Sequence, residues 1–252
     1  MAVLGYGEAG SDFVEGLLER GATVRVYDPV ANTPADIETA PSEAEAVMGA
    51  DLVLSVNSAS AAVDAFLAAL PRLAPGTIWA DMNTAAPALK QELADLAARH
   101  GVLFADVAIM APVPGNGIEV PMRVSGVAAD RVAETLAQFG TPIEIEPGPA
   151  GAAAQRKLLR SVFFKGMSAA VVEALAAARA AGCEDWLREN IVAEFVAAGE
   201  HTVDRLVVGS VQHAKRRAEE MAAAADMLES LGVAPHVAGA SRDVLRGLLA
   251  AR

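Results

Sequence analysis

The sequence is poor in cysteine, histidine and basic residues. Its one cysteine, Cys183, cannot form an internal disulfide, which favours a reducing compartment, and the helical pattern around it predicts a buried thiol. With 20 lysines and arginines against 32 acidic residues, the net charge of −12 leaves no basic stripe for nucleic acid. No metal-binding spacing is found among the four histidines, which are His100, His201, His213 and His236. We therefore expect no bound metal and no nucleic-acid partner.

Long apolar runs are also missing. No uninterrupted run reaches the roughly 18 residues that a helix needs to cross a bilayer. The first residues are typical of a strand and lack the basic and apolar regions of a secretory signal. The sequence thus predicts a cytoplasmic chain with no membrane partner, while a hydrophobic fraction of 53% supplies enough apolar side chains for a core.

A glycine-rich segment, Gly5-Tyr6-Gly7-Glu8-Ala9-Gly10, lies between an apolar strand and a helical pattern. In a G-x-G-x-x-G turn the first glycine permits the tight turn, the second admits a pyrophosphate, and the third lets helix and strand pack closely. The first N–H groups of the helix then face the anion. Asp28 ends the next strand, where a carboxylate binds a ribose hydroxyl and repels the 2′-phosphate of NADP. We predict a dinucleotide site that prefers NAD to NADP; an ordinary turn without a ligand is the alternative.

Residues 1–147 alternate short apolar segments with helical ones, a pattern typical of a parallel sheet covered by helices on both faces. Helices are expected at residues 61–70 and 87–100, with Pro71 and Gly101 as stop signals. We predict strands at residues 2–4, 23–27, 52–56, 77–80, 102–105, 122–125 and 143–145.

After Pro147-Gly148-Pro149 the sequence becomes rich in alanine, leucine and glutamate with helical periodicity. The expected class is therefore α/β, with a Rossmann-type doubly wound parallel sheet at 1–147 and a smaller all-helical domain for substrate and dimerisation at 148–252. The helical domain is rich in apolar side chains for its size, so we expect it to bury them against a second copy of the chain and form a homodimer. The expected helices cover residues 150–181, 184–198, 201–231 (interrupted near Gly209) and 241–250.

Two later segments distinguish among the dehydrogenases that share this organisation. They are residues 104–117 and the run Gly148-Pro149-Ala150-Gly151, which is followed by Lys157 and Ser161. Together with the N-terminal glycines, they resemble the β-hydroxyacid dehydrogenase family, which includes 3-hydroxyisobutyrate and 6-phosphogluconate dehydrogenases. The resemblance covers nearly the whole chain and is strongest to a bacterial branch with a shortened C-terminal helical domain. Imine reductases are more distant relatives with the same architecture.

Relatives carry a D-x-P-V-S-G-G-type segment that contacts the substrate. The resemblance implies substrate contacts for the corresponding residues here, which are Pro112, Val113, Pro114, Gly115 and Asn116. Proline at the serine position has neither a hydroxyl nor an N–H group to donate, so one substrate contact is missing. A buried turn without substrate contact is the alternative role of this segment.

The family's catalytic segment, G-x-x-G-x-G-x-x-x-K-x-x-x-N, matches at its first two glycines and at Lys157, whereas Ala153 and Ser161 replace the third glycine and the asparagine. The resemblance implies that Lys157 gives a proton to an alkoxide or takes one from an alcohol, with its pKa lowered beside the positive nicotinamide. Ser161 and Lys165 lie one and two turns further along the same helix face and are expected to contact substrate. The solvated edge of a long helix is the competing explanation.

Polar residues also follow two central strands at the carboxyl edge, where ligands bind in open α/β sheets. The resemblance implies that Asn57, Ser58 and Asn83 contact the cofactor and that Thr84 contacts the substrate. A helix N-cap is the competing role for Thr84.

These residues imply an NAD(P)-dependent oxidoreductase that transfers a hydride between nicotinamide and a small β-hydroxy acid or a related alcohol or carbonyl compound. An imine reductase is one alternative, which Pro114 keeps open. A dinucleotide-binding sensor or scaffold without catalysis is the other, for which Ala153 and Ser161 leave room.

Overall fold

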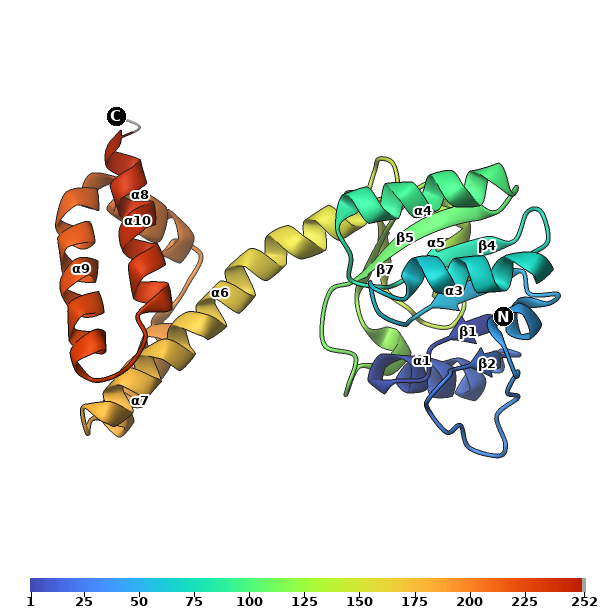
Figure 1. Ribbon diagram of the computed structural model, residues 1–252, viewed down its shortest axis with the longest axis horizontal. Helices are drawn as coiled ribbons and strands as arrows, with labels where there is room; N and C mark the ends of the chain where they lie inside the picture. Colours follow the sequence, from blue (N-terminus) through green and yellow to red (C-terminus); the bar gives the residue numbers. More distant parts are fainter. Residues whose placement is uncertain (251–252) are drawn as a thin grey trace. The chain divides into compact units, whose positions relative to one another are not determined.

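The computed structural model describes residues 1–250 and divides into two compact units, Met1–Arg160 and Ser161–Arg252. The long helix α6 (Ala152–Ala180) begins in the first unit and continues in the second (Figure 1). The predicted domain boundary after residue 147 lies shortly before this helix, and it stays a prediction.

The first unit is built on a seven-stranded sheet with the order β2-β1-β3-β4-β5-β6-β7 (Figure 1). This confirms the expected Rossmann-type α/β fold, and all the predicted strands are present. The strands are β1 (Ala2–Leu4), β2 (Arg25–Tyr27), β3 (Leu52–Ser55), β4 (Ile78–Asp81), β5 (Leu103–Ile109), β6 (Met122–Ser125) and β7 (Ile143–Ile145). The helices are α1 (Glu8–Glu19), α2 (Glu43–Val47), α3 (Ala62–Ala69), η1 (Leu70–Arg72), α4 (Pro87–Arg99), η2 (Gly117–Glu119) and α5 (Ala129–Ala137).

The sheet is mainly parallel, as expected, but β6 runs antiparallel to β5. Parallel neighbours need a long crossover, usually a helix, whereas residues 110–121 connect these strands through a loop that holds only the short η2. β5 also continues to Ile109, beyond its predicted end at residue 105, since its second half pairs with β6. This extension places Asp106 inside the sheet, opposite Ser125.

Apolar layers cover both faces of the sheet, because successive side chains of a strand point to opposite faces. Val3 and Leu54 pack in the layer that includes α1 and α5. Leu4 packs in the other layer with Phe66 of α3 and Trp79 of β4. The rings of Phe66 and Trp79 meet edge to face, with their centroids 4.9 Å apart.

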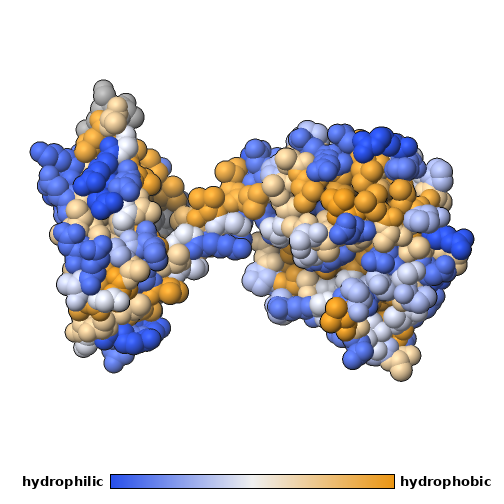
Figure 2. Space-filling view, viewed as in Figure 1, coloured by the Kyte–Doolittle hydropathy of each residue, from blue (hydrophilic) through white to orange (hydrophobic). Residues whose placement is uncertain are grey.

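The second unit is helical, as predicted, and contains little apolar core. Its helices after α6 are α7 (Glu184–Ala197), α8 (Thr202–Gln212), α9 (Ala214–Ser230) and α10 (His236–Ala250). A small buried cluster is formed by Ala177, Ala225, Leu228 and Ala238. Within the described residues, α7 and α8 bury none of their side chains, and Figure 2 shows apolar side chains on the surface.

The helix expected at residues 201–231 is interrupted at His213, between α8 and α9, rather than near Gly209. Gly209 instead lies inside α8, where the guanidinium of Arg217 approaches its backbone. A Cβ atom at Gly209 would lie 3.0 Å from Nη2 of Arg217. The glycine therefore makes room for the Arg217 side chain and does not interrupt the helix.

Two further expectations about the second unit were wrong. The last helix begins at His236 rather than at residue 241, because the Glu173 carboxylate accepts hydrogen bonds from the N–H groups of Val237 and Ala238. Because Glu173 is more than 60 positions away in the sequence, the residues around His236 give no indication that a helix starts there. Cys183 is exposed rather than buried, since it lies at the start of α7.

Among the described helices, α6 is the one long and apolar enough to cross a membrane by length and composition. Only 11% of its apolar window is buried within the chain, so most of that surface is open to a partner. The expectation that the chain has no membrane partner stays a prediction.

We predict that Phe66→Ala lowers the free energy of unfolding by about 3–5 kcal/mol, because it leaves a cavity beside Trp79. Leu67→Ala, one residue further on the same helix, is the matched control. Its side chain is 46% exposed, and the change should cost less than about 0.5 kcal/mol. Urea unfolding of both variants measures the difference; equal losses would contradict the assignment of Phe66 to the core.

Candidate functional site

The glycine turn joins β1 to α1 and has the form that its motif predicted. Gly5 has a φ of +109°, and a Cβ atom there would lie 2.4 Å from the carbonyl oxygen of Val56. A Cβ atom at Gly10 would lie 2.1 Å from the carbonyl oxygen of Gly5. Both glycines are therefore required by the protein's own packing. At Gly7, the N-cap of α1, a Cβ atom would meet nothing within 4 Å, which leaves open the space beside the helix N-terminus that a pyrophosphate needs.

Asp28 connects the end of β2 to the glycine turn. Its Oδ2 accepts a hydrogen bond from the N–H of Tyr6 at 2.7 Å, and its Oδ1 accepts from Val30 at 2.8 Å and Ala31 at 2.7 Å. Burial raises the pKa of Asp28, but these N–H groups outweigh burial and hold the pKa below its usual value. Asp28 is consequently ionised at neutral pH, as a ribose-binding carboxylate must be.

A hollow of about 370 Å³, which we call the Asp28 hollow, lies beside this carboxylate. Gly5 and Asn57 line it from the ends of β1 and β3, and Glu43 and Asp64 add two more carboxylates. Within residues 1–250, no lysine or arginine lines this hollow. Ser58 does not line it; its hydroxyl accepts a hydrogen bond from the N–H of Ala61 before α3.

A second hollow, of about 340 Å³, also borders the glycine turn and is called the Lys157 hollow. It is bounded by the glycine turn, by the ends of β3, β4 and β5, and by the start of α6. Its polar lining residues include Glu8, Asn57, Asn83, Thr84 and Lys157. The structure thus brings together residues that were predicted to hold the cofactor and residues that were predicted to act on the substrate.

Asn83 is buried at the end of β4 and has a defined orientation. Its Nδ2 donates to Oδ1 of Asp81 at 2.5 Å and to Oγ of Ser55 at 3.1 Å. Its Oδ1 is buried and has no hydrogen-bond partner among the described residues. Thr84 does not cap α4, because that helix starts at Pro87 with Ala86 as its N-cap and without a side-chain cap.

Lys157 is half-buried in the second turn of α6, and the start of this helix is fixed to the sheet. Oδ2 of Asp106 accepts hydrogen bonds from the N–H groups of Gly151 and Ala154, at 3.0 and 2.9 Å. Oγ of Ser125 accepts from the N–H of Ala153 at 3.0 Å. The first turn of α6 is therefore capped by β5 and β6, and this capping sets the direction in which Lys157 leaves the helix.

Arg156 is exposed but has an ion-pair partner. Its guanidinium forms an ion pair with Glu146 at 2.9 Å, and Glu146 also pairs with Arg123 of β6 at 2.9 Å. The hydrogen bond from Arg156 is the main reason that the pKa of Glu146 is lowered. These contacts attach the side of α6 next to Lys157 to the sheet.

The sequence reasoning missed a buried group of charges below the Lys157 hollow. The ammonium of Lys90, on α4, lies 3.2 Å from Oδ2 of Asp81 and 3.1 Å from Oδ1 of Asp106, and it donates to the carbonyl oxygen of Asp81 at 2.8 Å. All three side chains are 0% exposed. Burial raises the pKa of Asp81, while the charge of Lys90 opposes that rise. A signal was available, because Lys90 shares a heptad-like face with the buried Leu93 and Ala97.

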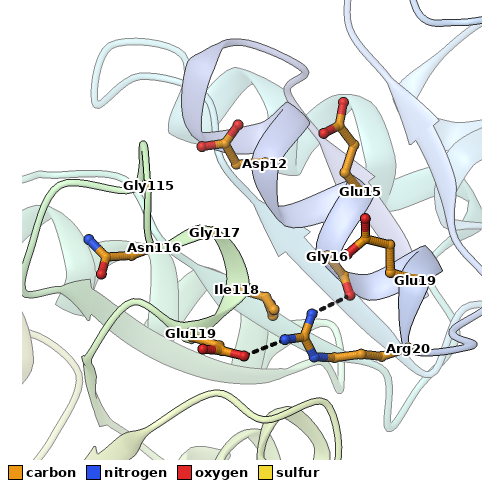
Figure 3. Close-up of a pocket in the computed structure, with 10 residues that line it drawn as sticks. All are labelled: Asp12, Glu15, Gly16, Glu19, Arg20, Gly115, Asn116, Gly117, Ile118 and Glu119. Atoms are coloured by element: carbon orange, nitrogen blue, oxygen red, sulfur yellow. Dashed lines mark hydrogen bonds and ion pairs between the residues drawn. The ribbon is translucent and has the colours of Figure 1, made fainter.

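The segment that was predicted to bind substrate is divided between two places. Val113 lines the Lys157 hollow, but Gly115 and Asn116 line a different hollow against α1 (Figure 3). There, Asp12, Glu15 and Glu19 of α1 line the hollow together with the loop (Figure 3), and Nδ2 of Asn116 donates to the carbonyl oxygen of Pro112 at 2.8 Å. Pro112 and Pro114 are exposed. The substrate contacts expected of these residues stay predictions.

Ser161 and Lys165 lie on α6 within the second unit, where Ser161 is partly exposed and Lys165 is exposed. Their expected contacts with substrate also stay predictions. Within the described residues, no group of three histidine, cysteine or acidic side chains could hold a metal ion.

Comparisons with known proteins agree with this geometry. A family model described as the NAD binding domain of 6-phosphogluconate dehydrogenase matches residues 1–119, and a domain of unknown function (DUF1932) matches residues 178–248. Over 196 residues the chain is 26% identical to an NAD-dependent L-serine dehydrogenase of Pseudomonas aeruginosa, covering 73% of this chain and 65% of that protein. Over 147 residues it is 32% identical to an uncharacterised 28.5 kDa protein of Methanothermus fervidus, covering 57% and 55%. The chain thus spans less than two thirds of both curated relatives.

The fold is also found in an imine reductase from Myxococcus stipitatus that was solved with NADP⁺. The two structures superpose with a TM-score of 0.83 over 99% of this chain and 94% of that one, at 20% sequence identity. Both the sheet and the helical part are thus shared. The matched N-terminal domain, the dehydrogenase relative and the glycine turn agree with one another: residues 1–119 match an NAD binding domain of the 6-phosphogluconate dehydrogenase type, and the chain is similar to the β-hydroxyacid dehydrogenases.

Proposed function

We propose that the chain is an NAD(P)-dependent oxidoreductase that transfers a hydride between nicotinamide and a small β-hydroxy acid or a related alcohol or carbonyl compound. The observation that carries this proposal is the Lys157 hollow, in which Lys157 and Asn83 face the same space beside the N-terminus of α1. This lining supports a role for Lys157 in exchanging a proton beside a bound dinucleotide.

The bound cofactor supplies or accepts the hydride, and the residues of this chain do the remaining work. The open space at Gly7 and the N–H groups of α1 are suited to hold the pyrophosphate, and Asp28 to hold the ribose. Asn83 lines the hollow with its amide held by Asp81 and Ser55, so it is suited to contact the bound cofactor. Lys157 gives a proton to the oxygen that becomes a hydroxyl during reduction, and it takes that proton back during oxidation.

An imine reductase is the second candidate, in which the same hydride reaches a C=N carbon. One observation favours it: Pro114 has no hydroxyl for a hydroxy acid. The similar fold of the Myxococcus enzyme adds support. Turnover of NADH or NADPH with a panel of aldehydes, keto acids, hydroxy acids and cyclic imines separates the candidates, and cofactor binding without turnover of any compound would favour a sensor.

We infer a preference for NAD from the charges of the Asp28 hollow. Asp28, Glu43 and Asp64 place three carboxylates along it, and the described residues put no cation there. At an effective dielectric of about 20, one unit pair about 4 Å apart is repelled by up to about 4 kcal/mol, which salt reduces. A 2′-phosphate therefore meets a penalty that a ribose hydroxyl does not.

A homodimer is inferred from the second unit, whose apolar side chains are exposed instead of packed in a core. The sequence suggests six apolar residues for an interface. Five of them, Val162, Phe163, Leu206, Val207 and Val208, are at least half exposed, whereas Val171 is only partly exposed. Trp186, Phe195 and Val196 of α7 add to this surface. A second copy of the chain would cover such a surface, and it would also cover the apolar length of α6. We retain the cytoplasm as the expected compartment.

Lys157→Ala should leave the Kd for NADH within about twofold and lower kcat by about 10²–10⁴-fold, because the glycine turn and Asp28 hold the dinucleotide while Lys157 moves the proton. Lys157→Arg should be nearly as inactive, since a guanidinium does not exchange its proton near neutral pH. Lys215→Ala, at an exposed lysine on α9, is the control and should keep wild-type turnover. Wild-type turnover in Lys157→Ala would remove Lys157 from the reaction.

NADH should bind about 10–100-fold more tightly than NADPH, which corresponds to roughly 1–3 kcal/mol of repulsion at the Asp28 hollow. Titration calorimetry of the wild-type protein with both cofactors measures the ratio. The preference should shrink in the Glu43→Gln/Asp64→Asn variant, which keeps Asp28. Equal binding of the two cofactors by the wild type would contradict the inference.

The solution mass should be about twice the 25.9 kDa of one chain at micromolar concentration. Val196→Glu should shift the protein toward the monomer, because it buries a charge in the expected interface. Val127→Glu is the matched control, since both valines are 81% exposed but Val127 lies in the first unit. Light scattering after size-exclusion chromatography distinguishes the outcomes, and a monomeric wild type would refute the dimer.

A further inference from the structure

We propose that Lys90 is a positioning residue of the reaction, whose buried ammonium holds both Asn83 and the start of α6 in place through two aspartates. This inference rests on the proposed function, in which Lys157 and Asn83 act in the Lys157 hollow. Lys90 itself does not line that hollow, so it can act only through its partners.

Each aspartate divides its two carboxylate oxygens between Lys90 and one side of the hollow. Oδ2 of Asp81 faces Lys90, while its Oδ1 accepts hydrogen bonds from the N–H and the Nδ2 of Asn83. Oδ1 of Asp106 faces Lys90, while its Oδ2 accepts from Gly151 and Ala154 at the start of α6. A single ammonium is therefore shared by the two elements that present Asn83 and Lys157.

The orientation of Asn83 depends on this arrangement. Its Nδ2 is directed to Asp81 and Ser55, and consequently its Oδ1 is the atom left without a partner in the described structure. If Asp81 turned away, the amide could rotate and exchange the positions of its donor and its acceptor at the edge of the hollow. The Lys90–Asp81 pair prevents that rotation by fixing the carboxylate at its other oxygen.

The position of Lys157 depends on the other aspartate. Lys157 follows Ala154 by three residues, less than one helical turn, so a shift of the capped turn moves its side chain with it. Gly151 also packs against α4, the helix that carries Lys90: a Cβ atom at Gly151 would lie 2.8 Å from the carbonyl oxygen of Pro87. α4 thus contacts the start of α6 both directly and through the Lys90–Asp106 pair.

Stability alone does not explain this group of charges. Removing a lysine and two aspartates completely from water is costly, and well-packed apolar residues in such places are often as stable or more so. The surrounding positions of α4 show that apolar packing is available, since Leu93 and Ala97 on the same face are fully buried. Apolar side chains in these positions could not orient their neighbours. The four carboxylate oxygens of Asp81 and Asp106 do so, because each interacts with a specific polar group.

The test compares Lys90→Met with Leu93→Ala, which perturbs the same buried face of α4 without touching the aspartates. Both changes should lower the melting temperature. Lys90→Met should in addition lower kcat by about 10–100-fold, the loss expected from misplacing a reacting group by about 1 Å, with KM and the Kd for NADH within about threefold. Leu93→Ala should retain kcat below its melting temperature.

A second variant, Asp106→Asn, covers the case in which Lys90→Met does not fold. The amide keeps the shape of the carboxylate and can still accept from Gly151 and Ala154, but it cannot neutralise Lys90. It should lower kcat like Lys90→Met.

A readout without turnover separates this inference from the proposed function. The chain has four lysines, Lys90, Lys157, Lys165 and Lys215, so the ¹³Cε signals of labelled lysine can be assigned by substitution. The Lys157 signal should move in Lys90→Met and Asp106→Asn and stay in place in Leu93→Ala. A fixed Lys157 signal with unchanged kcat in the folded variants would overturn the positioning role, and a moved signal in a protein without any turnover would instead count against the proposed function.

Discussion

The candidate site depends on the buried carboxylate of Asp106, which contacts both Lys90 and the start of α6. It joins β5, α4 and α6 at one point, because one oxygen faces Lys90 and the other caps the first turn of α6. This is possible because β5 has two different neighbours: its first half pairs in parallel with β4, and its second half, from Asp106 to Ile109, pairs antiparallel with β6. The change in strand direction thus brings Ser125 beside Asp106, and both side chains hold the same helix end.

Much of the fold was predictable, because a short apolar segment indicates a strand regardless of which strands lie beside it in the sheet. β6 and β7 were predicted with their observed ends, and the helical half was recognised by its periodicity. The direction of β6 was not predictable, since a loop of about a dozen residues permits either direction and only contacts with the sheet decide. The start of α10 was missed for a similar reason: its cap, Glu173, belongs to a distant helix.

The candidate site was predictable where one residue type is required by local geometry. Gly5 and Gly10 are such residues, because any Cβ atom would strike the backbone, and Asp28 follows from the length of the β–α–β unit. The Lys90 group was missed because a lysine on a helix is ordinarily read as solvent-exposed, and its two partners lie on separate strands. The placement of Gly115 and Asn116 was not readable either, since the path of a loop depends on what α1 leaves open.

The hydrogen bonds of Asp28 have a consequence for the way this fold can change its cofactor. Three backbone N–H groups already occupy its oxygens, so the loop after β2 and the glycine turn are ordered before any nucleotide arrives. Less chain entropy is then lost on binding, which favours affinity. The same hydrogen bonds limit how the cofactor preference can be changed. Replacing Asp28 to admit a 2′-phosphate would remove them and loosen the glycine turn, which is needed for NAD and NADP alike. A change of cofactor would therefore begin at Glu43 and Asp64, which line the same hollow.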